Sequence, residues 1–314
     1  MTAAPLVLLD SASLYFRAYY GVPQSMTSPD GIPVNAVRGF TDTLARIITE
    51  RRPCRLVACL DADWRPAFRV ALLPSYKAHR VADEEANAEE VPDTLSPQVP
   101  IILDVLAAAG IATAEAAGHE ADDVIGTLTA RERVDRVEAI TGDRDLFQIV
   151  RDKPTPARVI YVGKGWQKAE ILGPVELAAK YGLPDFETGP AYADLALLRG
   201  DPSDGLPGVA GIGEKTAAKL LVEFGSLTGL LEATVAGDGR VPPRIAQKLA
   251  EAADYLTRAP AVVRVVTDAP IEFSGPDAVP AAPADPDRLA ELAERWGLDS
   301  SVRRLSEALA ANAR

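Results

Sequence analysis

Short apolar runs alternate with stretches of helical periodicity along the first half of the chain. Five of these runs are typical of buried strands: residues 5–10, 55–61, 111–116, 136–143 and 158–162. Three stretches between them repeat apolar side chains every three or four residues, as amphipathic helices do: residues 36–52, 98–110 and 120–134. Strands that alternate with helices favour an α/β fold with a doubly wound, mostly parallel sheet flanked by helices.

The pattern changes after the fifth run. Helical stretches joined by glycine-rich turns follow, and the next apolar run with strand character is residues 261–266. Residues 274–286 contain four prolines, which favours a linker or an ordered strap, and an amphipathic stretch comes after them. We therefore expect three parts: a first domain at residues 1–168, a helical domain at residues 169–268 and a C-terminal extension at residues 269–314.

The composition is that of a globular protein, since 47% of the 314 residues are hydrophobic and 25% are charged. The two cysteines, Cys54 and Cys59, exclude a disulfide scaffold and a cysteine-zinc site, and they suit a reducing compartment. With His79 and His119 as its histidines, the chain has no histidine-rich metal site. The N-terminal apolar run lacks a basic leader and is too short to cross a membrane. We expect a cytoplasmic protein without a signal peptide.

Acidic residues recur where the predicted strands end and where helices begin. Ligands of an open α/β sheet bind beyond the carboxyl ends of its strands, so these carboxylates can converge in one crevice. For any single acid, capping of free backbone amides is an alternative role. The nine candidates are Asp10, Asp61, Glu120, Asp122, Asp123, Asp143, Asp145, Asp201 and Asp204.

A cluster of carboxylates requires cations or shared protons. Two carboxylates about 4 Å apart repel by roughly 4 kcal/mol at an effective dielectric of about 20. Oxygen ligands without neighbouring Cys or His favour Mg²⁺ or Mn²⁺ over zinc, and the spacings D-x-D, E-x-D-D and D-x-x-D suit two ions. Two such ions clamp the attacking and leaving oxygens of a phosphoryl displacement. The pattern therefore predicts metal-assisted phosphodiester hydrolysis.

The net charge of −12 argues at first against a nucleic-acid partner. If the nine acids bind metal, however, thirty-six acids remain against thirty-three bases, and two divalent ions add positive charge. The acidic total therefore does not exclude DNA.

Residues 206–221, LPGVAGIGEKTAAKLL, have the pattern of a helix-hairpin-helix motif. Its glycines let the turn approach a backbone closely, and free amides at the start of the next helix bind a phosphate oxygen. Such a motif grips DNA without reading its bases. An ordinary glycine-rich helix corner is the alternative. The residues that we expect to contact DNA here are Gly211, Gly213, Lys215, Thr216 and Lys219.

Residues 67–80, which we call the basic segment, follow Asp61 and contain Arg69, Tyr76, Lys77 and Arg80. Lys77 and Arg80 are three residues apart, so on a helix they would share a face that can meet a phosphate near the metals. We expect Arg69 and Tyr76 to contact DNA as well. The histidine at position 79 is predicted to be a surface residue of this segment.

An aromatic stretch at residues 14–20 follows Asp10 and contains Arg17, which we also expect to contact DNA. Its rings either stack on a nucleobase or fill the core. Residues 82–93 carry six acids and no base, which is typical of a solvated mobile loop.

The chain resembles a known family in six segments. In order, these segments are VLLDSASLYFRAYYG, DADWRPAFR, YKAHR, GHEADDVIGTL, TGDRDLFQIV and RGDPSDGLPGVAGIGEKTA. They are similar to blocks of the bacterial 5′ nuclease family, which comprises the 5′ nuclease domain of DNA polymerase I and stand-alone flap endonucleases. The resemblance covers about residues 5–268, and residues 285–305 resemble the segment that joins this domain to polymerase. Because the chain stops there, a free-standing nuclease is implied.

The resemblance implies a PIN-like nuclease domain with an arch at about residues 70–98, followed by a helical domain with a helix-three-turn-helix motif. It also implies a structure-selective 5′-3′ exonuclease and flap endonuclease of DNA replication and repair. Its substrates would be DNA with 5′ ends, nicks, gaps or flaps. We expect a monomer that binds no membrane, and no sliding-clamp peptide is evident.

The resemblance further implies roles for single residues. Lys77 and Arg80 match basic residues at the base of the arch that hold the scissile phosphate. Backbone carbonyls near Val209 and Ile212 match a potassium site in the hairpin. The acids match two ligand groups, supported by Asp123: Asp10, Asp61, Glu120 and Asp122 for one metal, and Asp143, Asp145, Asp201 and Asp204 for the second. The acidic run 83–90 departs from the family, because it should repel a threaded 5′ strand.

Two other functions stay open at the level of the sequence. One is a DNA-junction binding protein with a weak or inactive metal pocket, which the complete set of acids disfavours. The other is an RNase of the related PIN-like fold. Its single-domain members lack the glycine-rich segment at residues 208–217, which we call the glycine hairpin. An RNA primer attached to DNA remains a substrate compatible with both the hairpin and the acids.

Overall fold

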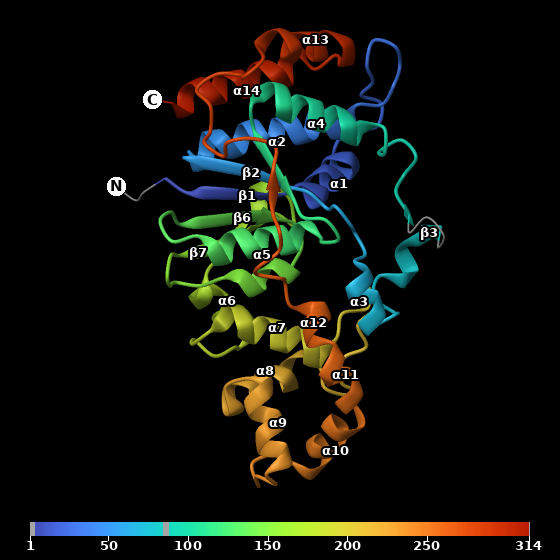
Figure 1. The fold of residues 1–314 in the computed structure, drawn as a ribbon, viewed down its shortest axis with the longest axis vertical. Coiled ribbons are helices and arrows are strands. Elements are labelled where there is room, and N and C mark those ends of the chain that lie inside the picture. The colour runs from blue at the N-terminus through green and yellow to red at the C-terminus, as the bar shows by residue number, and fades with distance from the viewer. Residues whose placement is uncertain (1–3, 84–87, 314) are drawn as a thin grey trace.

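A computed structural model describes residues 4–83 and 88–313. The molecule is elongated, with the sheet towards one end and a group of helices at the other (Figure 1). Residues 84–87, the middle of the acidic run predicted to be a loop, lie outside the described residues. In the part of the chain that the structure describes, no helix combines the length and the apolar character needed to cross a bilayer.

Within the described residues, seven strands form one sheet in the order β8-β7-β6-β1-β2-β5-β9. Its five central strands are parallel: β1 (Leu6–Asp10), β2 (Arg55–Cys59), β5 (Ala112–Glu115), β6 (Val137–Thr141) and β7 (Ala157–Tyr161). The predicted mostly parallel sheet flanked by helices is therefore confirmed. The sequence pattern missed two short antiparallel edge strands: β8 (Glu170–Leu172) and β9 (Glu272–Phe273).

Both faces of the sheet are buried, which explains why its strands are continuous apolar runs. Val7 of β1 faces one side, which α2 (Asn35–Arg51) and α4 (Gln98–Ala109) cover. The next residue, Leu8, faces the other side, which α5 (Ala121–Arg131) covers. Complete burial of one such side chain stabilises the fold by about 1.5–3 kcal/mol. This core holds the carboxyl ends of the strands in fixed positions.

The helical region lies beyond the β7 side of the sheet (Figure 1). It begins with α6 (Pro174–Tyr181) and α7 (Thr188–Arg199), and the glycine-rich turn then leads into α8 (Glu214–Phe224). The remaining helices are α9 (Leu227–Val235), α10 (Pro243–Glu251), α11 (Ala253–Arg258) and α12 (Pro260–Val263). The strand expected at residues 261–266 is wrong, because Pro260 starts a helical turn there with its fixed φ angle.

Several short elements surround the predicted site. The helix α1 (Ser11–Gly21) follows β1 directly. The helix α3 (Ala67–Leu72) is the first part of the basic segment and packs against α12. A hairpin of β3 (Val81–Asp83) and β4 (Ala88–Glu89) comes after it. The 3₁₀ helices are η1 (Ala78–Arg80), η2 (Asp145–Ile149), η3 (Trp166–Lys168) and η4 (Pro202–Asp204).

The proline-rich residues 274–286 form an ordered strap, one of the two predicted possibilities. The Leu56 N–H donates to the Asp277 carbonyl at 2.8 Å, and the Val279 N–H donates to the Cys54 carbonyl at 3.1 Å. The strap leads from the helical region back across the sheet to α13 (Pro286–Trp296) and α14 (Asp299–Asn312), which pack on α4 and α2 (Figure 1).

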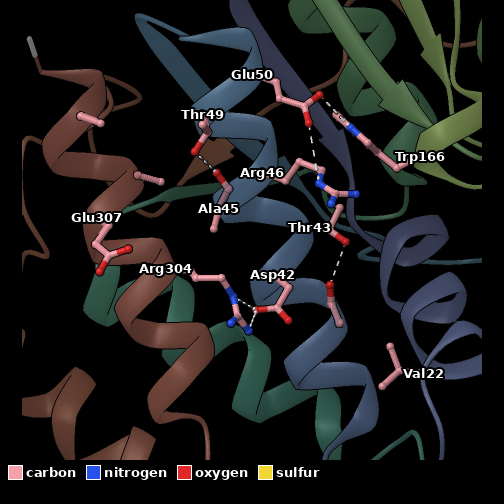
Figure 2. Close-up of a pocket in the computed structure, with 13 residues that line it drawn as sticks. Val22, Asp42, Thr43, Ala45, Arg46, Thr49, Glu50, Trp166, Arg304 and Glu307 are labelled. Carbon is pink, nitrogen blue, oxygen red and sulfur yellow. Dashed lines mark hydrogen bonds and ion pairs between the residues drawn. The ribbon is translucent and has the colours of Figure 1, made fainter.

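A groove of about 690 Å³ lies between α2 and α14 (Figure 2). Arg304 pairs with Asp42 across the groove, and Arg46 pairs with Glu50. Trp166 donates its indole N–H to Glu50 at 2.8 Å. None of the nine predicted acids lines this groove, so it is separate from the predicted chemistry.

Candidate active site

Asp10 and Asp61 lie just where the strand pattern places them. Asp10 ends β1 and is buried; it accepts hydrogen bonds from the Ser13 N–H at 3.1 Å and the Thr141 hydroxyl at 2.6 Å. Asp61 follows β2 and accepts a hydrogen bond from the Ala121 N–H at 2.7 Å. Both acids therefore cap helix N-termini, the alternative role considered for them, and the caps fix their position at the edge of the sheet.

Three acids occupy the start of α5. Glu120 precedes the first turn, and Asp123 accepts a hydrogen bond from the Glu120 N–H at 3.3 Å, which closes a capping box. Asp123 is wholly buried (0% exposed), whereas Asp122 is half-buried. Asp122 is therefore the more accessible of this adjacent pair.

The other four acids come from two separate turns. Asp143 and Asp145 follow β6, and Asp143 accepts a hydrogen bond from the Asp145 N–H at 3.0 Å. Asp201 begins η4, where it accepts a hydrogen bond from the Ser203 N–H at 2.9 Å. Asp145 and Asp204 line the same small cavity, and the charge of Asp204 raises the pKa of Asp145 further after the larger effects of burial and Asp143. The structure thus brings the two turns together.

Eight of the nine acids, which interact electrostatically, are called the acid cluster here; Asp123 also acts on Asp61 but is left out because it is wholly buried. Burial, together with Asp61 and Asp143, raises the pKa of Asp10 to about 7. Loss of hydration and the nearby Asp10 raise the pKa of Asp122 well above its usual value; burial and Asp143 do so for Asp145. The members of the acid cluster are Asp10, Asp61, Glu120, Asp122, Asp143, Asp145, Asp201 and Asp204.

The donor chemistry of the acid cluster fits hard divalent cations. All its side-chain donors are carboxylate oxygens. Burial raises the pKa values of Asp10 and Asp122 most, and the neighbouring carboxylates raise them further, so bound cations would relieve the repulsion among these acids. As the side chains stand, no three acidic, His or Cys residues among those described are close enough to hold one ion. Glu120 pairs with Arg69 and Lys77, and Asp204 pairs with Arg80, so metal binding by these two acids would require them to exchange partners.

The basic segment reaches both halves of the acid cluster, but not as one helical face. Lys77 adopts a left-handed conformation (φ 48°) before the three-residue helix η1, so the predicted shared face with Arg80 is wrong. The ammonium group of Lys77 pairs with Glu120, and Arg80 pairs with Asp204 at 2.8 Å. Each base therefore meets one of the two predicted ligand groups.

Gly205 makes this approach sterically possible. It follows Asp204 with φ +70°, and a Cβ atom at this position would lie 2.0 Å from the Ser75 carbonyl oxygen. Only glycine avoids both the strained conformation and the clash. The basic segment can therefore lie directly on the turn that carries Asp204.

Arg69 and Tyr76 do not have the positions expected for DNA contacts. Arg69 is 2% exposed and Tyr76 is 4% exposed. Arg69 pairs with Glu120 and Asp123, and the Tyr76 hydroxyl donates to Glu120 at 2.8 Å. Because both side chains are enclosed, the structure offers neither of them to DNA, and we correct that expectation. Their partners are acids, and the sequence pattern gave no indication of this pairing.

The glycine hairpin has the geometry of its motif. Gly211 has φ +71°, and Gly213 precedes α8, whose first turn has no side-chain cap. Val209 and Ile212 are buried, with the Ile212 N–H donating to the Val209 carbonyl at 2.9 Å. The polar side chains of α8 that we expect to contact DNA are exposed: Lys215, Thr216 and Lys219.

Two residues near these features were missed. Lys248 of α10 donates to the Gly211 carbonyl at 2.7 Å and so adds a positive charge at the hairpin. Gln148 of η2 donates to the Val263 carbonyl at 3.1 Å and accepts from the Val265 N–H at 3.0 Å. No local motif marks either residue, because each contact joins segments far apart in the sequence.

A cavity of about 630 Å³ opens beside Asp61. Its lining includes the aromatic residues Tyr15 and Trp64 and the acidic residue Glu89. Burial and the neighbouring Asp61 raise the pKa of Tyr15, so its hydroxyl stays protonated. Arg17, further along α1, donates to the Gly163 carbonyl at 2.8 Å and is half-buried.

Comparison with known proteins agrees with this geometry. Residues 5–182 match the 5'-3' exonuclease N-terminal resolvase-like domain, and residues 188–287 match the 5'-3' exonuclease C-terminal SAM fold. The chain belongs to the 5′-3′ exonuclease family. A Mycobacterium tuberculosis 5′-3′ exonuclease is 57% identical over 98% of each chain. A Streptomyces coelicolor 5′-3′ exonuclease is 56% identical over 97% of this chain and 100% of the relative.

More distant relatives include larger proteins. Mycobacterium tuberculosis DNA polymerase I is 37% identical over 98% of this chain and 32% of its own length. A bacteriophage T5 flap endonuclease, solved with DNA and metal ions, has a TM-score of 0.61 at 18% identity and covers 97% of this chain and 99% of its own. The structure of human GEN1 with Holliday junction DNA has a TM-score of 0.65 at 16% identity. The match covers 99% of this chain and 73% of the GEN1 chain. At these identities the two structures establish the fold.

Proposed function

We propose that this 5′-3′ exonuclease is a metal-dependent, structure-selective nuclease that hydrolyses DNA at 5′ ends, nicks, gaps and flaps. The observation that carries the proposal is the acid cluster. Eight carboxylates from both parts of the chain interact electrostatically at the carboxyl end of the sheet. The nearby glycine hairpin supplies a surface for DNA phosphates. Work at such DNA ends and junctions belongs to replication and repair.

The acid cluster would hold two or more Mg²⁺ or Mn²⁺ ions. Asp10, Asp61, Glu120 and Asp122 form one ligand group in this proposal, and Asp143, Asp145, Asp201 and Asp204 form the other. Two divalent ions supply an activated water and stabilise the leaving oxygen of a phosphodiester. The hydrogen bonds that Asp10 and Asp61 accept orient their carboxylates from behind, as outer contacts orient metal ligands. Metal ions are also present in the T5 flap endonuclease complex.

Lys77 and Arg80 are the residues that we propose to contact the scissile phosphate. Both approach the acid cluster from the basic segment and already lie against its carboxylates. A phosphate near the acids would therefore find two positive donors on one side. The positive charges also offset the repulsion between the acids and an anionic substrate.

The hairpin would hold the duplex part of the substrate. Gly211 and Gly213 allow close approach to the backbone, and Lys215, Thr216 and Lys219 add donors at the start of α8. We include potassium near the carbonyls of Val209 and Ile212, which the family resemblance suggests. Arg17, anchored beside Gly163, would contact the strand nearer the acids.

A panel of labelled DNA tests the proposal: a 5′ flap, a nick, a gap and a blunt end, each with Mg²⁺, Mn²⁺ or Ca²⁺. We expect Mg²⁺ and Mn²⁺ to support release of 5′ products, with flaps and nicks cut near the junction. Ca²⁺ should permit binding with little cleavage. Binding without cleavage in every metal would favour the DNA-junction binding protein. Preferential cutting of an RNA 5′ strand would favour a primer-directed nuclease.

A further inference from the structure

Arg69 uses its guanidinium group entirely inside the protein. Its Nε atom donates to the Val262 carbonyl at 2.9 Å. Its Nη1 atom donates to Glu120 Oε2 at 2.6 Å and to Asp123 Oδ2 at 2.7 Å, and its Nη2 atom donates to Asp123 Oδ1 at 2.7 Å. One buried side chain therefore connects α3, the start of α5 and the end of α12.

These contacts fix one side of the Glu120 carboxylate. Glu120 Oε2 accepts hydrogen bonds from both Arg69 and the Tyr76 hydroxyl. The other oxygen, Oε1, points towards the Lys77 ammonium group. The two oxygens of Glu120 therefore have different partners, and Arg69 together with Tyr76 leaves Oε1 as the oxygen that meets Lys77.

Asp123 extends the connection to the chain that returns from the helical region. Its Oδ1 atom accepts hydrogen bonds from Arg69 and from the Val266 N–H at 2.8 Å. Gln148 holds the same returning chain through Val263 and Val265. A small cavity bounded by this chain also touches Glu120, Asp122, Asp145 and Asp204. The returning chain therefore packs directly against the acid cluster.

We propose that Arg69 is a positioning residue for this nuclease: it orients Glu120 for metal binding and fixes the chain returning from the DNA-binding helices against the acid cluster. The proposal rests on the proposed function, in which Glu120 is a metal ligand. A buried ion pair gains little net stability over an apolar substitute, so this arrangement is better explained by geometry than by stability. The planar guanidinium provides it, because its donors lie in a rigid fork.

The substitutions Arg69→Lys and Arg69→Met test the proposal. Lysine keeps the charge but cannot span Glu120, Asp123 and the Val262 carbonyl at once. Arg51→Met is the matched control, because Arg51 forms a two-bond ion pair with the buried Glu138 between α2 and β6 and touches no member of the acid cluster. Mn²⁺ affinity is measured by calorimetry without DNA, together with melting temperature and kcat on a 5′ flap.

We expect Arg69→Lys to fold and to bind Mn²⁺ about 10-fold more weakly, as is typical when a contact behind a ligand is lost. Its kcat should fall while duplex binding in Ca²⁺ changes little. Arg51→Met should lower the melting temperature without changing Mn²⁺ affinity. A folded Arg69→Lys protein with wild-type Mn²⁺ affinity and kcat would overturn the proposal.

Glu120→Gln separates this proposal from the function on which it rests. If Glu120→Gln weakens Mn²⁺ binding but Arg69→Lys does not, the positioning role is wrong and the metal site stands. If neither substitution changes Mn²⁺ binding or cleavage, the assignment of Glu120 as a ligand is wrong, and both proposals fail.

Discussion

The Arg80 guanidinium lies 2.8 Å from Asp204 Oδ1, although 124 residues separate the two in the chain. The Lys77 N–H reinforces the contact by donating to the Asp204 carbonyl at 3.0 Å. The basic segment and the turn that carries Asp204 therefore form one unit. A change that separates them should affect phosphate contact and the acid cluster together.

Gly205→Ala should break this unit. Alanine in a left-handed conformation costs about 1 kcal/mol, and its Cβ would also lie 2.0 Å from the Ser75 carbonyl oxygen. Gly182→Ala is the control, because Gly182 has a similar φ of +66° and no atom within 4 Å of a built Cβ. We expect both substitutions to lower the free energy of unfolding, and Gly205→Ala alone to reduce cleavage at least tenfold. Equal activity of the two variants would contradict this account.

Asp145→Asn should abolish cleavage without lowering the stability of the metal-free protein. Asp143, Asp204 and Asp201 surround Asp145 and raise its pKa, after the larger effect of burial. Removing its charge relieves repulsion, so the metal-free variant should melt at or above the wild-type temperature. Flap cleavage in Mn²⁺ should be lost, with duplex binding in Ca²⁺ within a few-fold of wild type. Unchanged cleavage would refute the ligand assignment.

Asp123→Asn should have the opposite effect on stability. Arg69 would lose the charge of a wholly buried partner, and the Val266 N–H would lose its carboxylate acceptor. Breaking such a buried pair costs about 3 kcal/mol. Chemical denaturation of the metal-free protein measures this loss. A stability equal to that of Asp145→Asn would mean that Asp123 acts as another member of the acid cluster.

Metal stabilisation should depend on pH. The pKa of Asp10 is raised from 3.8 to about 7 by burial and by Asp61 and Asp143, so the folded protein holds this proton more tightly than the unfolded chain. This carboxyl group therefore lowers stability progressively as pH rises from 3.8 through about 7. Bound cations relieve the resulting charge and compete with the proton. The rise in melting temperature with excess Mn²⁺ should be larger at about pH 8 than at about pH 6; equal rises would contradict the linkage.

Lys215→Glu tests the hairpin. Loss of one phosphate contact should weaken duplex binding and reduce the slope of log affinity against log salt by about 1. Lys168→Glu, at an exposed lysine of η3, makes the same change of charge away from the hairpin. We expect Lys168→Glu to have the smaller effect. Equal losses would indicate a general effect of charge instead of a specific contact.

Local sequence patterns predicted most of the central elements and the candidate acids. Buried parallel strands must be apolar on both faces, so β1, β2 and β6 were visible as continuous runs. The acids Asp10 and Asp61 were recognisable because each comes directly after one of these apolar runs. The glycine hairpin could be recognised from the sequence because its turn depends on two glycines, Gly211 and Gly213, that are two residues apart. Each of these features follows from local constraints.

Contacts between distant segments became visible in the folded structure alone. The edge strand β9 pairs with β5, more than 150 residues earlier, and its two residues carry no periodic pattern. We expected Arg69 to contact DNA because the sequence shows only that it is charged. Its burial against Glu120 and Asp123 depends on the tertiary packing that brings α3 to the start of α5. The partner of a charged side chain is set by long-range packing, and no short-range pattern encodes it.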